Sequence, residues 1–344
     1  MNASDIFVYL VASAPAWWLM LRVRRLESGS QERAPVSVII PARNEERNIE
    51  GVVRAVLIQS KPEDEVIVVD DDSTDGTAKH AGRAGARVVQ AGGLPAGWLG
   101  KPHACWVGAN QATNEVLLFL DADVRLHGDA LNRVVTAVQR DRTALTSVQP
   151  FHEPGRWQEH SALPFNVVSV IASGAGGRTS LPLVFGPVLA CDVDRYRAVG
   201  GHSAASVRGS VVEDIALGKL FGRSRVFIGS RDTVTFRMYP DGFASMFRGF
   251  TKNMASGAAS ARGLSLLAAV SWVAAQSGAL FTSPLLYAMA VVQIWLVGRK
   301  VGRFNVIDAV LYPIGLVVFF AVLVRSAMVR VGLARVTWAG RRVR

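Results

Sequence analysis

The sequence predicts an α/β fold in which a mostly parallel sheet is flanked by apolar helical segments at both ends of the chain. Two observations carry this prediction. Between residues 36 and 149, short apolar runs of strand length alternate with segments of helical spacing, which is the pattern of βαβ units. Long uncharged stretches occupy residues 6–21 and much of the last third of the chain, and the mean hydropathy is +0.26.

The composition of this 344-residue chain indicates which kind of surface it meets, a membrane or a nucleic acid. The formal net charge is +11, and nine Lys or Arg residues follow position 298 against a single acid, Asp308. Basic residues that flank apolar runs indicate a membrane surface, and no zinc-finger or RNA-binding signature points to nucleic acid. Two cysteines are too few for a disulfide framework.

The N-terminal apolar run at residues 6–21 is followed, rather than preceded, by Arg22, Arg24 and Arg25. A cleaved signal peptide has its positive charge before the apolar run. We therefore expect an uncleaved transmembrane anchor over residues 1–26, with its C-terminal side in the cytoplasm.

An α/β catalytic domain is expected over residues 27–240. Apolar runs predict strands at residues 36–40, 66–69, 87–90, 116–120 and 144–149, and helical spacing predicts helices at 45–59, 77–84, 101–111, 129–140 and 211–221. The glycine-rich segment 173–178 is expected to be a mobile loop.

The remaining chain is expected to meet the membrane. Residues 241–262 predict an amphipathic interfacial helix, with a helix packed in the core as the alternative. Residues 263–344 predict C-terminal membrane helices and a basic tail, with apolar runs at 264–282, 284–298 and 306–324. The last run either spans the membrane or re-enters it at a break near Pro313, which would keep the basic tail cytoplasmic.

Polar clusters follow three of the predicted strands. They are Pro41-Ala42-Arg43-Asn44-Glu45-Glu46, Asp70-Asp71-Asp72 and Asp121-Ala122-Asp123. Because ligands collect at the carboxyl ends of strands in open α/β sheets, we expect the three clusters to share one edge. Paired carboxylates there fit a divalent cation that holds a diphosphate, although Asp121 and Asp123 alone could equally form a solvated turn.

These motifs, in this order and spacing, resemble family 2 glycosyltransferases of the GT-A fold. That family has P-x-R-N-E after its first strand, V-V-D-D-x-S-x-D around the second and a D-x-D metal motif about fifty residues later. The resemblance covers roughly residues 35–237 and implies a Rossmann-like nucleotide-sugar-binding sheet. The absence of G-x-G-x-x-G after the first strand disfavours a hydride-transferring enzyme.

The resemblance implies roles for individual residues. The residues expected to bind the nucleotide-sugar are Pro41, Arg43, Glu45, Asp71, Asp72, Lys101 and Asp121. Asp121 and Asp123 are expected to bind a Mg²⁺ or Mn²⁺ ion. Asp71 suits the uracil or ribose because a carboxylate only accepts hydrogen bonds. Asp72 stands where the family often has Gly or Asn, and it could instead cap the following helix.

Glu213-Asp214 resembles the acidic pair of inverting family members, with Asp214 as general base. The alternative is acidic charge that complements a helix N-terminus. Segments Gly97-Trp98-Leu99-Gly100-Lys101, Arg237-Met238-Tyr239 and Gly249–Asn253, and Gly340-Arg341-Arg342 after Trp338, resemble a carotenoid (diaponeurosporenoate-type) and lipid glycosyltransferase subgroup. Arg237, Tyr239 and Lys252 are then expected on the acceptor and membrane side.

Together these features predict a multi-pass enzyme of the cell (inner) membrane with a cytoplasmic catalytic domain. It would transfer a hexose, with glucose as the favoured sugar, from a UDP-sugar to a carotenoid acid or another isoprenoid lipid, with inversion. A polyprenyl-phosphate sugar synthase or polysaccharide synthase is an alternative, although no Q-x-x-R-W motif is present. A non-catalytic nucleotide-sugar-binding membrane protein is a third possibility.

Overall fold

The computed structural model describes residues 3–177, 183–257, 260–261, 263–333, 336–338 and 341–343. The chain divides into two compact units. Arg25–Pro150 and Val184–Phe236 form one, which we call the sheet unit. Met1–Arg24, Phe151–Leu183 and Arg237–Arg344 form the other, which we call the helical unit.

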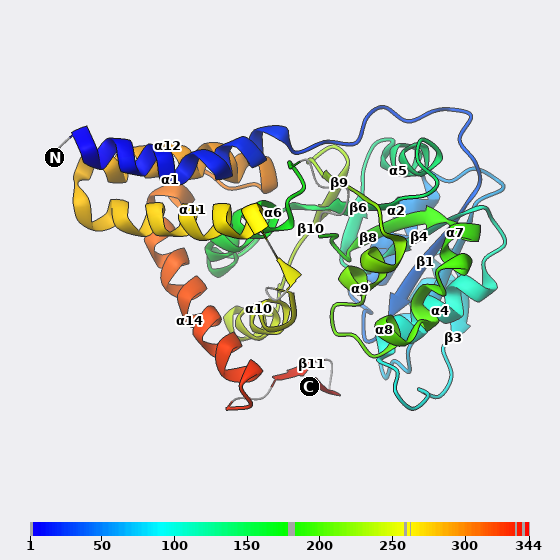
Figure 1. Cartoon of the computed structure of the whole chain (residues 1–344). Coiled ribbons are helices and arrows are strands. Elements are labelled where there is room, and N and C mark those ends of the chain that lie inside the picture. Colours follow the sequence, from blue (N-terminus) through cyan, green and yellow to red (C-terminus); the bar gives the residue numbers. More distant parts are fainter. Residues whose placement is uncertain are drawn as a thin grey trace. The chain divides into compact units, whose positions relative to one another are not determined.

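The sheet unit is built on a seven-stranded sheet with the order β3-β2-β1-β4-β8-β6-β9 (Figure 1). The strands are β1 (Val36–Ala42), β2 (Glu65–Asp70), β3 (Arg87–Gln90), β4 (Val116–Leu120), β6 (Leu145–Gln149), β8 (Val188–Asp192) and β9 (Ser224–Ile228). Every residue of β4, β6 and β8 is buried. Burial on both faces explains why β4, with the sequence VLLFL, is an apolar run without alternation.

The pairing within this sheet confirms the prediction of a mostly parallel α/β fold. β1 runs parallel to β2 and β4, β2 to β3, and β6 to β9, whereas β8 is antiparallel to both β4 and β6. The connecting helices are α2 (Ile49–Leu57), α3 (Thr77–Arg83), α4 (Gly100–Gln111) and α5 (Ala130–Gln139). Strand order reverses between β1 and β4, and such a switch point is where open sheets bind ligands.

Shorter elements complete the sheet unit. β5 (Val124–Leu126) pairs antiparallel with β10 (Val234–Phe236). After β8 the chain forms α7 (Val193–Ala198), the 3-10 helix η2 (Gly201–Ser203), α8 (Ala205–Arg208) and α9 (Glu213–Phe221). The first two residues of α9 are Glu213 and Asp214.

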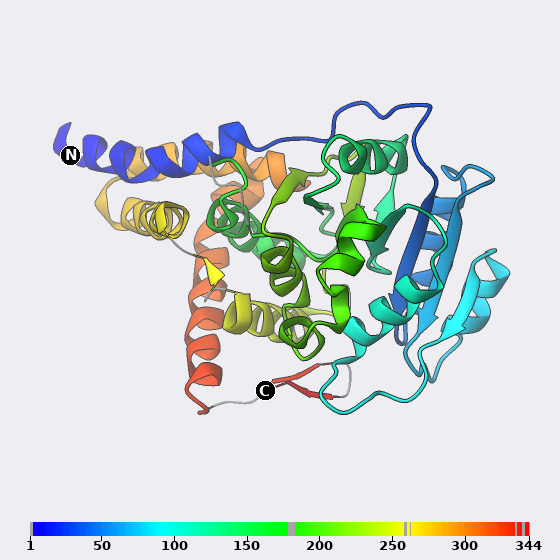
Figure 2. The same cartoon turned by 45° about the vertical axis from the view of Figure 1, so that its right-hand side comes forward.

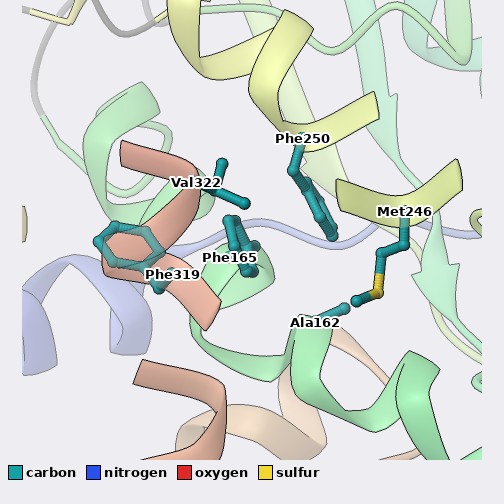
Figure 3. Packing of buried hydrophobic residues seen from close by; sticks show 6 residues of the cluster. All are labelled: Ala162, Phe165, Met246, Phe250, Phe319 and Val322. Carbon is teal, nitrogen blue, oxygen red and sulfur yellow. The ribbon is translucent and has the colours of Figure 1, made fainter. Parts of the chain in front are cut away.

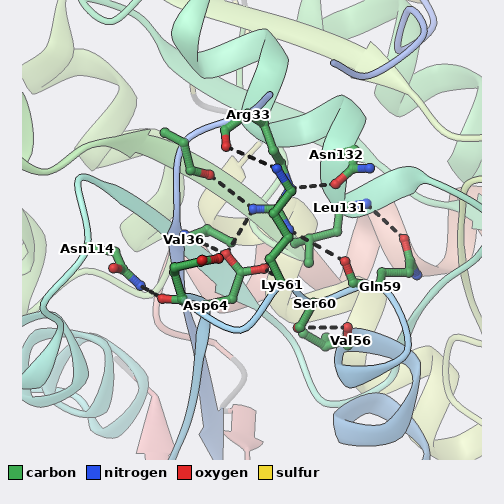
Figure 4. A network of polar contacts seen from close by, with 12 residues as sticks. Arg33, Val36, Val56, Gln59, Ser60, Lys61, Asp64, Asn114, Leu131 and Asn132 are labelled. Atoms are coloured by element: carbon green, nitrogen blue, oxygen red, sulfur yellow. Dashed lines mark hydrogen bonds and ion pairs between the residues drawn. The ribbon is translucent and has the colours of Figure 1, made fainter. Parts of the chain in front are cut away.

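A buried ion pair attaches the segment before β1 to the sheet unit (Figure 4). Arg33 Nη2 lies 2.5 Å from Asp64 Oδ2, and neither side chain is exposed. Arg33 also donates to Asn132 at the start of α5, while Asp64 accepts from the backbone N–H groups of Val36 and Lys61. Each buried charge therefore has partners, as burial of an ion requires.

The helical unit contains most of the apolar helices. They are α1 (Ala3–Arg22), α6 (Leu163–Ser173), α10 (Phe243–Gly257), α11 (Gly263–Thr282), α12 (Pro284–Val301), α13 (Val306–Val310) and α14 (Tyr312–Arg330), with the short pieces β7 (Phe151–His152), η1 (Trp157–Ala162), β11 (Val336–Trp338) and β12 (Arg341–Val343). Figures 1 and 2 show α1, α11 and α12 side by side and α14 crossing their direction steeply.

Among the described residues, four helices are long and apolar enough to cross a membrane: α1, α11, α12 and α14. A buried polar cluster lies between them. Gln293 Oε1 accepts from Trp272 Nε1 at 3.0 Å and from Gln276 Nε2 at 2.5 Å, and the Tyr9 hydroxyl lies 3.3 Å away. Tyr312, the first residue of α14, donates to the Gln276 carbonyl. Such bonds hold apolar helices in register.

A second cluster joins α6, α10 and α14 (Figure 3). Phe165 stacks on Phe250 with ring centroids 4.0 Å apart, and Phe319 packs beside Phe165. Met246 and Phe250 of α10 are buried here, whereas Phe243 of the same helix is 46% exposed. One face of α10 therefore packs within the unit, as in the packed-helix alternative, while another part of its apolar surface stays outside.

Candidate active site

The carboxyl ends of β1, β2 and β4 bring the three polar clusters to one edge of the sheet unit. Ala42 of β1 pairs with Asp70 of β2, so the chain leaves both strands at the same level. β4 lies on the other side of β1 in parallel register and ends one residue before Asp121. The edge is the switch point, and it therefore gathers residues from segments that are about eighty positions apart.

The loops after β1 and β2 hold each other in place. Arg43 Nη1 donates to the Asp71 carbonyl at 2.7 Å and lies 3.7 Å from its carboxylate, while the Asp71 N–H donates to Ala42. Asn44, with a φ of 56°, donates its N–H to Ser73 Oγ. Arg43 and Asp71 are thus brought together in a fixed pair, and the partly exposed Pro41 is the last residue but one of β1.

Asp72 does not cap the helix that follows it, so that alternative is wrong. The N-cap of α3 is Gly76, and Asp75 Oδ1 accepts from the N–H of Thr77. Asp72 is exposed and has a φ of 60°, a left-handed conformation that Gly or Asn adopts more readily. This geometry explains why a small or amide residue is suited to the position.

Lys101 joins two acidic segments of the site. Its Nζ lies 2.7 Å from Asp121 Oδ1 and 3.2 Å from Glu213 Oε1. Lys101 is the second residue of α4, Asp121 follows β4 and Glu213 opens α9, so one ammonium connects three elements. Burial alone would lower the pKa of Lys101, but the charges of Asp121 and Glu213 raise it well above its usual value.

Asp123 and Asp214 are the carboxylates with strongly raised pKa values. Burial, followed by the charges of Asp121 and Glu45, raises the pKa of Asp123 to about 7. Burial, followed by the charge of Glu213, raises that of Asp214 to about 7. The site therefore holds more negative charge than the one ammonium of Lys101 balances.

This excess of negative charge bears on whether the site suits a metal ion. Among the described residues, no group of three or more His, Cys, Asp or Glu side chains forms a ready-made metal site. Asp121 and Asp123 supply two carboxylates, which suits a hard divalent cation whose remaining ligands come from a diphosphate and water. The residues present fit such an ion.

Arg125 is a residue of this region that the sequence reasoning missed. It lies on β5, two positions after Asp123, and its guanidinium donates to the carbonyls of Ala122 and Asn48. The charges of Asp123 and Glu45 act on it, so it forms the cationic boundary of the acidic cluster. Strand periodicity could not have found it, because Asp123 lies in the turn before β5, and the contacts of Arg125 with Ala122 and Asn48 depend on the fold.

A backbone segment that runs beside Asp214 was also missed. Phe185 exchanges two hydrogen bonds with the buried Ser147 of β6, at 2.7 and 2.9 Å, and the Pro187 carbonyl accepts from the N–H of Asp121 at 2.9 Å. Between these anchors, a Cβ at Gly186 would lie 3.0 Å from Asp214 Oδ2. A side chain at position 186 would therefore press on the Asp214 carboxylate and shift it by a few tenths of an ångström.

The residues expected on the acceptor and membrane side belong to the helical unit. Arg237 forms a two-pronged ion pair with the buried Glu159, at 2.7 and 3.0 Å. Tyr239 has a φ of 54°, and its ring fills the space that a side chain at Gly249 would occupy. Lys252 is partly buried on α10. Gly340 of the C-terminal motif lies outside the described residues.

The comparisons with known proteins decide the family. Residues 37–178 match the profile of "Glycosyl transferase family 2". The chain is 34% identical over 272 residues to a 4,4'-diaponeurosporenoate glycosyltransferase of Staphylococcus haemolyticus, covering 74% of this chain and 72% of that one. The chain belongs to glycosyl transferase family 2. A second relative with the same name, from Staphylococcus aureus strain USA300, is 31% identical over 89% of this chain and 87% of its own length.

A solved structure shows the same fold over both units. It is a mannosyltransferase from Pyrobaculum calidifontis, determined with GDP-Man and Mn²⁺, and it covers 96% of each chain with a TM-score of 0.60 at 18% identity. The predictions of a GT-A-like fold and of a family 2 glycosyltransferase are confirmed. The chain is a glycosyltransferase with one N-terminal and three C-terminal apolar helices that are candidates to cross a membrane.

Proposed function

We propose that this enzyme transfers a sugar, with inversion, from a UDP-sugar to a carotenoid-type carboxylic acid in the cytoplasmic leaflet of the cell membrane. The observation that carries the proposal is the grouping of Lys101, Asp121, Asp123, Glu213 and Asp214 at the switch edge, in a chain whose relatives are named for such an acid. The same chain has four helices that are long and apolar enough to cross a membrane, and an apolar acceptor would be dissolved there.

On the donor side, the interlocked loops after β1 and β2 supply the nucleotide contacts. Asp71 is held by Arg43 and can accept from the imide N–H of a uracil or from a ribose hydroxyl. Pro41, Glu45 and Asp72 line the same edge. These residues bind and orient the nucleotide, and they leave the diphosphate beside Lys101 and Asp121.

Asp121 and Asp123 would hold a Mg²⁺ or Mn²⁺ ion. When bound, the ion supplies positive charge against the diphosphate leaving group. Lys101 forms ion pairs with Asp121 and Glu213, and we infer that its ammonium also reaches the diphosphate of a bound donor. Glu213 then acts as a positioning residue that keeps the ammonium within reach.

On the acceptor side, Asp214 is the base. The acceptor O–H gives its proton to the Asp214 carboxylate, the acceptor oxygen forms a bond to the anomeric carbon, and the bond from that carbon to the diphosphate oxygen breaks. UDP leaves with the electron pair, and attack opposite the leaving group inverts the anomeric configuration. Gly186 leaves the space beside Asp214 Oδ2 that an acceptor oxygen needs.

The pKa of Asp214 suits an acid that arrives from a membrane. A carboxylic acid in an apolar environment has a raised pKa and keeps its proton, because burial disfavours the charged form. Burial also raises the pKa of Asp214 to about 7. A base and an acid with similar pKa values exchange a proton with little free-energy cost.

The membrane arrangement we propose keeps the sheet unit cytoplasmic. α1 ends in Arg22, and Arg299 and Lys300 lie in the last turn of α12, so the cytoplasmic ends of both helices are basic. The steep crossing of α14 in Figures 1 and 2 supports a helix that re-enters the bilayer rather than crossing it beside α1 and α12.

UDP release by the purified full-length chain tests this function. With UDP-glucose and Mn²⁺, we expect release to depend on an added carotenoid acid and to be at background with a polyprenyl phosphate. An Asp214→Asn variant is the matched control, since the amide keeps the size of the side chain but cannot accept the proton. Faster release with polyprenyl phosphate than with the acid would instead favour a polyprenyl-phosphate sugar synthase.

A further inference from the structure

A cavity lies at the C-terminal end of α1 within the helical unit. Its volume is about 440 Å³, and it is lined by Arg22, Arg24, Ala175, Gly176 and Gly177. Arg22 is the last residue of α1, and the glycine-rich segment follows α6. None of these residues belongs to the site described above, which lies entirely in the sheet unit.

The glycine-rich wall of this cavity is pressed against α1. A Cβ at Gly176 would lie 1.9 Å from the Leu19 carbonyl oxygen, so only glycine permits this approach. Gly174 ends α6 in the left-handed conformation, and its carbonyl accepts from the N–H of Gly177 at 2.8 Å. The wall therefore exposes backbone rather than side chains, as in loops that admit the oxygens of an anion.

The opposite wall is cationic and exposed. The Arg22 guanidinium stacks on the Trp18 ring at 3.6 Å, which fixes its plane while leaving its N–H groups free to donate outward. Among the described residues, neither Arg22 nor Arg24 has a carboxylate partner within ion-pair distance. Lys300 Nζ donates to the carbonyl of Met20, two residues before Arg22, so a third cation lies near the end of α1.

The position of the cavity at the ends of α1 and α12 indicates the class of ligand that it binds. α1 and α12 are candidate membrane spans, and both end here in basic residues beside Trp18 and Trp295. Tryptophan and arginine at a helix end mark the depth of the lipid headgroups. We propose that this cavity binds the phosphate headgroup of an anionic phospholipid, with Arg22 and Arg24 as its ligands.

Two properties favour a phosphate over a diffuse attraction to the membrane. Arginine forms paired hydrogen bonds to phosphate oxygens, and two guanidinium groups facing one cavity can bind one headgroup from two sides. Gly176 and Gly177 have no side chains that would occupy the cavity, so this wall presents backbone to the ester oxygens of a headgroup. Bound lipid would tie α1 to the segment after α6.

Binding of phosphatidylglycerol to the full-length chain in non-ionic detergent, followed by native mass spectrometry, tests the proposal. We expect Arg22→Gln/Arg24→Gln to weaken binding about tenfold to a hundredfold, the loss expected for charge-assisted hydrogen bonds. Arg325→Gln/Arg330→Gln on α14 is the matched control, with the same loss of charge, and should change binding less than about threefold. Arg22→Lys/Arg24→Lys should be intermediate, because lysine keeps the charge but not the fork.

The ligand arms separate the sources of the anion. Phosphatidylcholine and oleate should bind weakly, and millimolar inorganic phosphate should not displace phosphatidylglycerol. Full displacement by inorganic phosphate would show a free-anion site and overturn the lipid assignment, and equal binding of oleate would overturn the phosphate. Equal weakening in the control double variant would reduce the effect to general charge attraction and overturn the site itself.

Discussion

The substitution Lys101→Met tests how much the charge of Lys101 stabilises the acidic site. The Lys101 ammonium lies 2.7 Å from Asp121 and 3.2 Å from Glu213. At an effective dielectric constant of about 20, each attraction is about 5–6 kcal/mol before any cost is subtracted. Methionine has nearly the same length and shape, so the substitution removes the charge and little packing.

The net loss of stability is much smaller than these attractions. Desolvation of the ammonium offsets most of them, and the Lys101 side chain is 38% exposed, so solvent screens the pairs. We expect unfolding to become easier by about 2 kcal/mol, which corresponds to a lowering of Tm by about 4–8 °C for a unit of this size. Lys101→Arg, which keeps the charge, should lose less.

The assay is thermal unfolding with and without Mn²⁺. If Lys101 stands in for a divalent ion at Asp121, the ion no longer competes with an ammonium in Lys101→Met, and the rise in Tm on adding Mn²⁺ should exceed that of the wild type. Lys219→Met, a loss of an exposed lysine from α9, is the control and should respond like the wild type. A smaller Mn²⁺ response in Lys101→Met than in the wild type would refute the reasoning.

Three further predictions concern the base and the frame of the sheet unit. Gly186→Ala should lower kcat about tenfold with little change in donor KM, because the new Cβ, 3.0 Å from Asp214 Oδ2, displaces the base by a few tenths of an ångström; a change in donor KM alone would contradict this. Below pH 7 the rate should rise with pH, since Asp214 accepts a proton only when ionised; a rate that falls as the pH approaches 7 from below would exclude it as the base. Arg33→Met should destabilise the protein by about 3–5 kcal/mol in thermal unfolding, because it leaves the fully buried Asp64 carboxylate without its cation; a loss below about 1 kcal/mol would show that the pair is not needed.

The edge of the sheet was predictable because its residues are local to strand ends. The clusters after β1, β2 and β4 are each contiguous in the sequence, and parallel pairing brings contiguous strand-end residues to one level without knowledge of packing. The apolar runs of α11 and α12 were predictable for the same reason, since an uncharged stretch of spanning length is a local property.

The residues that were missed depend on contacts between distant segments. Gly186 is one glycine among 32, and only the path of its backbone past Asp214 distinguishes it. Ser147 looks like any serine in a strand until its two bonds to Phe185 are seen. Asp72 failed as a cap because the turn from Ser73 to Gly76 delays the helix start, which places Asp75 within reach of Thr77 instead.

The product in membranes tests the central claim most directly. Cells that supply a carotenoid acid and UDP-glucose would express the intact chain or its Asp123→Ala variant, and their lipids would be compared by mass spectrometry. We predict a glycosyl ester of the carotenoid acid with the intact chain and none with Asp123→Ala. The account would be contradicted by an unchanged acid in cells that contain the intact chain, or by equal amounts of ester with both.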